Sequence, residues 1–177
     1  MTQTKSIWIT SGYEILALQG ENALKIETLA KKIGISKSSF YHHFANMQLF
    51  VEELLNYHLE QSKIIAEKEK LAQTIQPELI EILVEHKTDL LFNRQLRFNQ
   101  QKKEFRETLE KSNQIIGNEF VKVWANDLQL KLSVKQLESI FELALENFFL
   151  QINPENISFE WISHYFENLK RIAKNFE

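Results

Sequence analysis

Two short helices joined at a single glycine form the most restrictive pattern in this sequence. The run IETLAKKI, residues 26–33, repeats apolar residues at spacings of three and four, which predicts one buried helical face. Gly34 then ends this helix. Ser36 is expected to cap a helix over residues 37–43, because its hydroxyl can accept a hydrogen bond from a backbone N–H of that helix. Since Ala30 is small enough to let the two helices lie close together, the segment predicts a helix-turn-helix.

Turn-forming residues are scarce in the whole chain, because its 177 residues include only 4 Gly and 2 Pro. Such a composition favours helices over sheets, which need more turns. Amphipathic spacing predicts further helices over residues 6–19, 47–71 and 77–92, a long helix ending at 128, one capped by Ser133, and 159–174. We therefore expect an all-α fold of about nine helices. An N-terminal three-helix head contains the helix-turn-helix, and a C-terminal helical bundle follows it.

Charge is distributed unevenly along the chain. Residues 1–50 carry five lysines and three glutamates, a net charge of +2, whereas the remainder carries −5. A mildly basic head on an acidic body fits a head that meets nucleic acid and a body that does not.

Several classes of protein are disfavoured by what the sequence lacks. Without cysteine there is no disulfide, no thiolate nucleophile and no cysteine zinc site, which suits a reducing, cytoplasmic location. No apolar run approaches the roughly 18 residues of a membrane span, and we see no signal peptide, so no membrane partner is expected. A di-metal site in a helical bundle needs Glu-x-x-His pairs, but the residues three places before the five histidines are Ser39, Phe40, Leu55, Leu83 and Trp161. We therefore expect no enzyme activity, no metal and no cofactor.

Residues 7–50 resemble the DNA-binding head of the TetR family of bacterial transcriptional regulators. The matching positions lie in both short helices and in the turn between them: Leu29, Ala30, Gly34, Ile35, Ser36, Phe40, Tyr41, His43 and Phe44. The resemblance implies a DNA-binding domain over residues 1–50 and a helical effector-binding and dimerisation domain over residues 51–177.

The sequence departs from the family pattern in four places. The family usually has Thr, Ala, Gly-Thr and Lys at the positions of Lys25, Gly12, Ser38-Ser39 and Met47. The missing lysine at position 47 removes one cation from the edge that would face phosphates. A helical adaptor whose degenerate head no longer binds DNA is the alternative that this departure leaves open.

The second helix of the pair carries residue types suited to DNA. Lys37 can donate to a guanine edge or to a phosphate. The hydroxyls of Ser39 and Tyr41 can donate to phosphate oxygens, and such contacts fix register without reading sequence. His42 can reach a base or the backbone. The complete candidate set for binding double-stranded DNA is Lys25, Lys37, Ser38, Ser39, Tyr41, His42 and His43, of which the resemblance implies backbone contacts for Tyr41 and His43.

The resemblance also implies that the body binds a small molecule and forms a homodimer. The candidate effector residues are His86, Arg97, Phe98, Phe105, Asn113, Trp124, Asn147 and Phe148, although the aromatic ones can equally fill a core. The last two predicted helices are apolar on more than one face, so one face can pack on the body and another on a partner. The residues expected at the dimer interface are Phe141, Leu145, Phe148, Phe149, Trp161, Tyr165, Phe166 and Leu169. We expect a ligand-responsive repressor that binds a near-palindromic operator as a homodimer and is released by a partly apolar small molecule.

Overall fold

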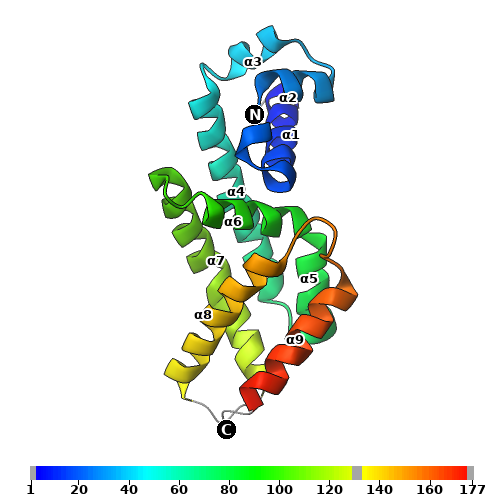
Figure 1. The fold of residues 1–177 in the computed structure, drawn as a ribbon, viewed down its shortest axis with the longest axis vertical. Helices are drawn as coiled ribbons and strands as arrows, with labels where there is room; N and C mark the ends of the chain where they lie inside the picture. The colour runs from blue at the N-terminus through cyan, green and yellow to red at the C-terminus, as the bar shows by residue number, and fades with distance from the viewer. Residues whose placement is uncertain (1–2, 129–132, 175–177) are drawn as a thin grey trace. The chain divides into compact units, whose positions relative to one another are not determined.

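The computed structural model describes residues 3–128 and 133–174, and within these ranges the chain forms nine α-helices and no strand (Figure 1). The helices are α1 (Gln3–Gln19), α2 (Ile26–Ile33), α3 (Lys37–His43), α4 (Met47–Glu69), α5 (Ile80–Glu85), α6 (Lys87–Phe98), α7 (Lys103–Leu128), α8 (Val134–Gln151) and α9 (Phe159–Lys174). A short 3-10 helix, η1 (Glu21–Ala23), precedes α2, and a π-helical turn, η2 (Ile75–Leu79), precedes α5. The predicted all-α fold is confirmed.

Local signals placed most helix ends correctly, but the helix predicted over residues 77–92 was wrong. The chain instead forms η2, α5 and α6 over this region. His86 takes φ −95° and ψ 26°, outside the helical region, so α5 ends there. Its carbonyl then accepts the N–H groups of Asp89 and Leu90, which starts α6. Neither Gly nor Pro marks this break in the sequence.

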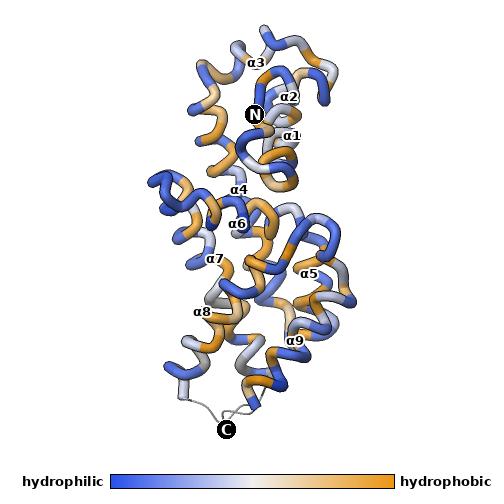
Figure 2. The backbone as a smooth tube through the Cα atoms, viewed as in Figure 1, coloured by the Kyte–Doolittle hydropathy of each residue, from blue (hydrophilic) through white to orange (hydrophobic). Residues whose placement is uncertain are grey.

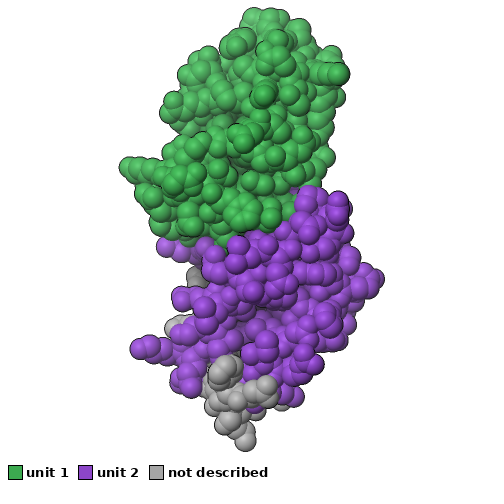
Figure 3. All heavy atoms as spheres, viewed as in Figure 1, with its two compact units in different colours: residues 1–61, 91–112 green, residues 62–90, 113–177 purple. Residues whose placement is uncertain are grey.

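The chain divides into two compact units, which Figure 3 shows in different colours. Unit 1 contains Met1–Gln61 and Leu91–Ser112, and unit 2 contains Ser62–Leu90 and Asn113–Glu177. The head over residues 1–50 is therefore part of a larger unit that also takes in the first half of α4, most of α6 and the start of α7. The functional division at residue 50 stays a prediction.

An aromatic cluster forms the core of unit 1 beneath α3. Phe40 is fully buried, and its ring lies 5.4 Å from Trp8 of α1 and 5.2 Å from Phe50 of α4, both edge to face. Phe44 closes the cluster at 4.8 Å from Phe50. Each such pair contributes about 0.5–1.5 kcal/mol beyond burial of its area. Because α3 has only seven residues, this side-chain packing rather than helix propensity holds it in place.

A chain of buried polar groups joins α1, α4, α6 and α7 within unit 1. The Tyr13 hydroxyl lies 2.8 Å from Nδ1 of His58, whose Nε2 lies 3.2 Å from the Ser112 hydroxyl. The side-chain Nδ2 of Asn93 donates to the same hydroxyl at 3.2 Å. Arg97 in turn donates to the side-chain Oδ1 of Asn93. All five side chains are buried. Buried polar groups must be hydrogen-bonded to be tolerated, so this chain fixes the register of four helices.

In unit 2, α8 and α9 pack through aromatic side chains. Helix α8 begins with a capping box, in which the N–H of Gln136 donates to the Ser133 hydroxyl and the Gln136 side chain accepts from the N–H of Ser133. Tyr165 of α9 donates its hydroxyl to the Ala144 carbonyl of α8 at 2.6 Å. Its ring lies 5.3 Å from that of Phe148 and stacks on Trp161.

Hydropathy along α9 shows how one helix can serve both core and surface. Figure 2 shows hydrophobic and hydrophilic residues alternating along it. Ile162, Phe166 and Ala173 are buried, whereas Glu160 and His164 are exposed. Among the helices in the described part of the chain, none has the length and apolar character that crossing a membrane requires.

Candidate nucleic-acid interface

The turn between α2 and α3 depends on the backbone of Gly34. This residue takes φ 68° and ψ 24°, the left-handed conformation that other residues adopt only with strain. Its N–H and that of Ile35 both donate to the Ala30 carbonyl, so this carbonyl near the C-terminal end of α2 has hydrogen-bond partners. No atom lies within 4 Å of the place where a Cβ on Gly34 would project, so backbone conformation rather than crowding makes glycine necessary.

Ser36 precedes α3 as the sequence predicted, but its hydroxyl does not cap the helix. Its backbone is extended, with φ −63° and ψ 148°, yet no backbone N–H donates to its side chain. The hydroxyl lies instead 2.8 Å from that of Ser38, and the Ser36 carbonyl accepts from the N–H of Ser39. The predicted side-chain cap was therefore wrong. At the next helix the cap does form, because Asn46 accepts from the N–H of Leu49 at 2.9 Å.

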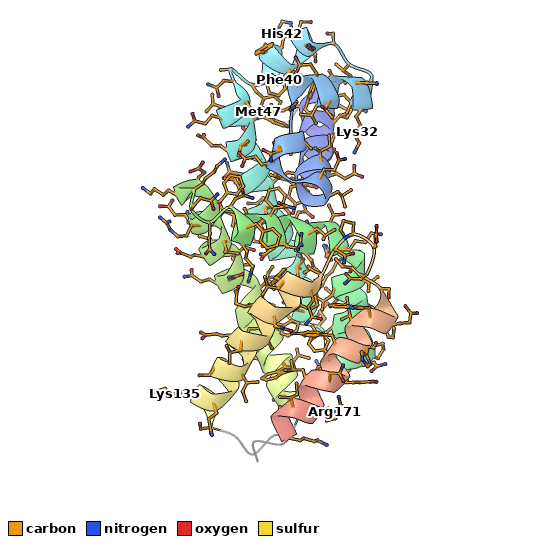
Figure 4. All side chains as sticks on the ribbon, viewed as in Figure 1. Lys32, Phe40, His42, Met47, Lys135 and Arg171 are labelled. Atoms are coloured by element: carbon orange, nitrogen blue, oxygen red, sulfur yellow. The ribbon has the colours of Figure 1, made fainter. Side chains whose placement is uncertain are left out.

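Helix α3 has a buried side and an exposed side. Figure 4 shows Phe40 on the inner side of α3 and His42 on the outer side. The Tyr41 side chain is 59% exposed although its neighbour Phe40 is fully buried. Ser39 and His43 are half-buried, and the ring of His43 lies 6.1 Å from that of Phe44. The side of α3 that faces solvent thus presents hydrogen-bonding groups on a rigid apolar base.

Most of the predicted DNA-binding residues share this solvent-facing side. Lys37, Ser38, Tyr41 and His42 are exposed on α3, and Lys25 is exposed immediately before α2. Ser39 and His43 face solvent only in part, which leaves their predicted phosphate contacts as predictions. This exposed set contains two lysine ammonium groups, two hydroxyls and an imidazole, all of which can donate to phosphate oxygens or base edges.

An ion pair between α2 and α3 was not anticipated from the sequence. Lys37 Nζ lies 2.6 Å from the carboxylate Oε1 of Glu27, and both side chains are exposed. The hydrogen bond from Lys37 is the largest cause that lowers the pKa of Glu27 below its ordinary 4.5, and Lys25 adds a smaller electrostatic contribution. Sequence reasoning missed this pair because the two residues are ten positions apart and meet only through the Gly34 turn.

Two other head lysines are also paired with glutamates. Lys32 lies 2.8 Å from Glu14 of α1, and Lys5 lies 2.8 Å from Glu53 of α4. The ammonium of Lys5 also lies 5.7 Å above the ring of Phe44. Three of the five lysines in residues 1–50 therefore form ion pairs with carboxylates in the free protein.

The predicted effector residues divide between the two units. Arg97, Phe98 and Phe105 belong to unit 1, whereas the others belong to unit 2: His86, Asn113, Trp124, Asn147 and Phe148. Five of the eight are buried, Asn113 is half-buried, and Phe98 and Asn147 are exposed. Their role in binding an effector stays a prediction.

His86 takes part in a charged cluster with residues from α4 and α6. The Lys68 ammonium lies 2.9 Å from Nε2 of His86, and Nδ1 of His86 lies 2.8 Å from the Asp89 carboxylate. An ammonium only donates, so a hydrogen bond between these two groups requires Nε2 to accept. Lys68 also donates to Glu85 at 2.6 Å, and this bond lowers the pKa of that carboxylate. Throughout the described residues there is no group of three or more His, Cys, Asp or Glu side chains that could hold a metal ion.

Several residues predicted at the dimer interface pack within their own chain. Phe148, Phe149 and Phe166 are buried, and the others are half-buried: Phe141, Leu145, Trp161, Tyr165 and Leu169. Among the side chains of α8 that the structure describes, the exposed apolar ones include Leu143 and Leu150, at 75% and 66%. The interface assignment stays a prediction, and the sequence did not separate these two kinds of position because both are apolar.

Comparison with known proteins connects the head to a family. Residues 9–54 match the family model described as bacterial regulatory proteins, tetR family. The whole chain is similar in fold to the crystal structure of a transcriptional regulator (TerR/AcrR family) from Aquifex aeolicus VF5. The TM-score is 0.62 at 18% sequence identity, and the match covers 98% of this chain and 99% of that chain, which shows a shared fold. No curated protein matches the sequence.

Proposed function

We infer that the protein is a regulator of the tetR family that represses transcription as a ligand-responsive homodimer, because residues 9–54 match the model of that family. The observation that carries the proposal is the two-sided character of α3. Phe40 is fixed in the core while Tyr41 and His42 beside it face solvent. A recognition helix needs a buried side that packs rigidly on the core and a solvent-facing side that presents hydrogen-bond donors. If the helix or its donors are misplaced, contacts in the major groove are lost.

Dimerisation through α8 and α9 is supported by their exposed apolar side chains. Leu143 and Leu150 are seven residues apart and therefore lie on the same face of α8. Ile172 of α9 is 52% exposed. A two-fold dimer would carry two copies of α3 and would bind half-sites about 34–36 Å apart, one turn of DNA, or a multiple of that distance apart. The operator is therefore expected to be near-palindromic.

Release by a small molecule follows from linkage. An effector that binds one conformation of the body more tightly shifts the population towards it, and DNA affinity falls if that conformation separates the two heads by the wrong distance. The candidate effector residues include aromatic side chains and Arg97, so a partly apolar molecule is the expected class. Helix α4, whose first residues belong to the head, is the proposed lever for this change.

Selection of bound DNA from a pool of random duplexes tests the proposal. The purified full chain is mixed with the pool at two salt concentrations, and the retained duplexes are sequenced. Enrichment of a near-palindrome at both concentrations is the expected result. Retention without enrichment, lost at the higher concentration, would indicate only electrostatic contact with phosphates and would favour an adaptor with a degenerate head.

A further inference from the structure

We propose that Glu27 determines the specificity of the DNA interface by holding Lys37 away from the phosphates of non-target DNA. The inference rests on the proposed function, because it concerns how the same α3 surface distinguishes one duplex from another. Glu27 was not among the residues that the sequence pointed to, and it carries a charge of the sign that DNA repels.

The geometry shows that the pair belongs to the DNA-facing surface rather than to the core. Glu27 lies in the first turn of α2 and Lys37 is the first residue of α3. Their side chains are 66% and 54% exposed, and their charged atoms lie 2.6 Å apart. Exposed ion pairs contribute little to folding stability, so stability gives no sufficient reason for the pair. Its effect is on the charge and position of Lys37.

The two kinds of hydrogen-bond acceptor on DNA, guanine edges and phosphates, differ in how strongly they repel the Glu27 carboxylate. A lysine ammonium has three donor hydrogens, so Lys37 can keep its bond to Glu27 and still donate to O6 and N7 of a guanine. A guanine edge has no net charge, so its O6 and N7 repel the carboxylate only weakly. A phosphate carries a full negative charge and does repel it, so Lys37 gains less from a phosphate while Glu27 is beside it. Glu27 therefore weakens phosphate binding more than base readout.

Other charges around the pair reinforce this assignment. Lys25 is the neighbouring cation that also acts on the Glu27 carboxylate, and it is exposed. The pKa of Glu27 is lowered, so the carboxylate is charged at neutral pH. Two of the lysines that were candidates for DNA contacts thus act electrostatically on this carboxylate.

The isosteric substitution Glu27→Gln tests the proposal on the full chain. Binding is measured by fluorescence anisotropy on the selected operator and on a scrambled duplex, at about 50 and about 200 mM salt. The variant is expected to bind the scrambled duplex more tightly and to lose specificity, since its affinity for the operator rises less. One additional phosphate contact steepens the salt slope by about 0.9, so the gain on the scrambled duplex should be about 3.5-fold larger at the lower salt concentration.

Glu14→Gln is the matched control, because it removes the same charge from the same unit and breaks the 2.8 Å pair with Lys32. Figure 4 shows Lys32 at the end of α2, away from His42 on α3. This control is expected to change the affinity for both duplexes by the same factor. In a second control, the effect of Glu27→Gln is measured in a chain that already carries Lys37→Ala, where it should disappear. Circular dichroism verifies that each variant is folded.

Two results would overturn the inference. One is that Glu27→Gln raises the affinity for both duplexes by the same factor, as expected for the Glu14→Gln control. The other is a gain that persists without Lys37, which would make Glu27 a general repulsive charge. If the unmodified chain itself fails to distinguish the operator from the scrambled duplex, the proposed function fails and this inference fails with it.

Discussion

The ring of Phe50 occupies the space into which a side chain on residue 12 would project. A Cβ at Gly12 would lie 2.8 Å from Cε1 of Phe50 and 3.4 Å from Cδ2 of Leu54. The Phe50 ring is itself enclosed, with Phe40 at 5.2 Å and Phe44 at 4.8 Å. The close approach of α1 and α4 at Gly12 therefore makes room for the Phe50 ring in the aromatic cluster that supports α3.

Substitution of Gly12 with alanine is expected to destabilise the protein. Alanine favours a helix interior by about 1 kcal/mol over glycine, but overpacking a core typically costs about 1–3 kcal/mol. The second effect should win, because the enclosed ring cannot move aside without disturbing Phe40. Urea denaturation measures the free energy of unfolding. Gly117→Ala is the control, since nothing lies within 4 Å of its Cβ position inside α7 and it should stabilise the protein. Equal stabilisation by both substitutions would contradict this account of the core.

Substitution of Tyr13 with phenylalanine tests the buried polar chain of unit 1. The change removes the 2.8 Å hydrogen bond to His58 and leaves a ring nitrogen without that partner. The expected loss of stability is about 1–3 kcal/mol, the cost of an unsatisfied buried polar group. The exposed Tyr41→Phe variant undergoes the same chemical change and should alter stability by no more than about 0.5 kcal/mol. Thermal and urea unfolding measure the change in the free energy of unfolding for both variants. A similar change in Tyr13→Phe and Tyr41→Phe would show that the bond to His58 is dispensable.

Tyr165 makes the packing of α8 against α9 sensitive to high pH. Burial raises the pKa of Tyr165 to about 12 from 10.0. Because the folded-state pKa is raised, the stabilisation is complete below pH 10 and is lost as pH rises through 12. The urea midpoint of the unmodified chain should therefore fall between these values. The Tyr165→Phe variant should show a smaller fall over the same range, and an identical fall in both would exclude Tyr165 as the cause.

Leu150 provides a test of the dimer. The side chain is 66% exposed in the single chain, so Leu150→Glu should change the folding of one chain little. In a dimer the same substitution buries a carboxylate without a partner, which strongly disfavours association. Analytical ultracentrifugation is expected to show a dimer for the unmodified chain and a monomer for the variant. Leu71→Glu, at a leucine after α4 that is 79% exposed, should remain dimeric. A dimeric Leu150→Glu variant would place the interface elsewhere.

Lys37 and Tyr41 should affect DNA binding in different ways. Tyr41→Phe removes a donor to a phosphate and is expected to weaken binding to all duplexes by a similar factor. Lys37→Ala should relax preference at one base pair, which would cost about 1–3 kcal/mol at the operator if Lys37 reads a guanine. A loss of salt slope with unchanged preference would instead assign Lys37 to a phosphate. The absence of any effect from either variant would exclude α3 as the recognition helix.

Sequence patterns predicted the head well because its determinants are local. Gly34 has a backbone conformation that favours glycine, and apolar spacing predicted the limits of α2. The start of α3 was predicted from Ser36, which precedes the helix although its hydroxyl does not cap it. The break at His86 was missed, since no turn-forming residue marks it, and the contacts of His86 with Lys68 and Asp89 appear only in the folded chain.

The candidate interface was predicted less completely than the fold. The sequence identified Lys37 and Tyr41 by residue type, but the pairing of Lys37 with Glu27 depends on how the Gly34 turn brings α2 and α3 together. In α8, Phe148 and Leu150 are both apolar, yet only Leu150 faces solvent. Hydrophobicity alone does not tell which of two apolar residues packs on its own chain.

The most direct test of the central claim is the ratio of dissociation constants for a scrambled duplex and for the selected operator, measured by fluorescence anisotropy at one salt concentration. If α3 of a dimer reads the operator, the ratio should be about 1,000 or greater. A ratio near one, with affinity that disappears as salt is raised, would contradict the assignment of this protein as a sequence-specific regulator.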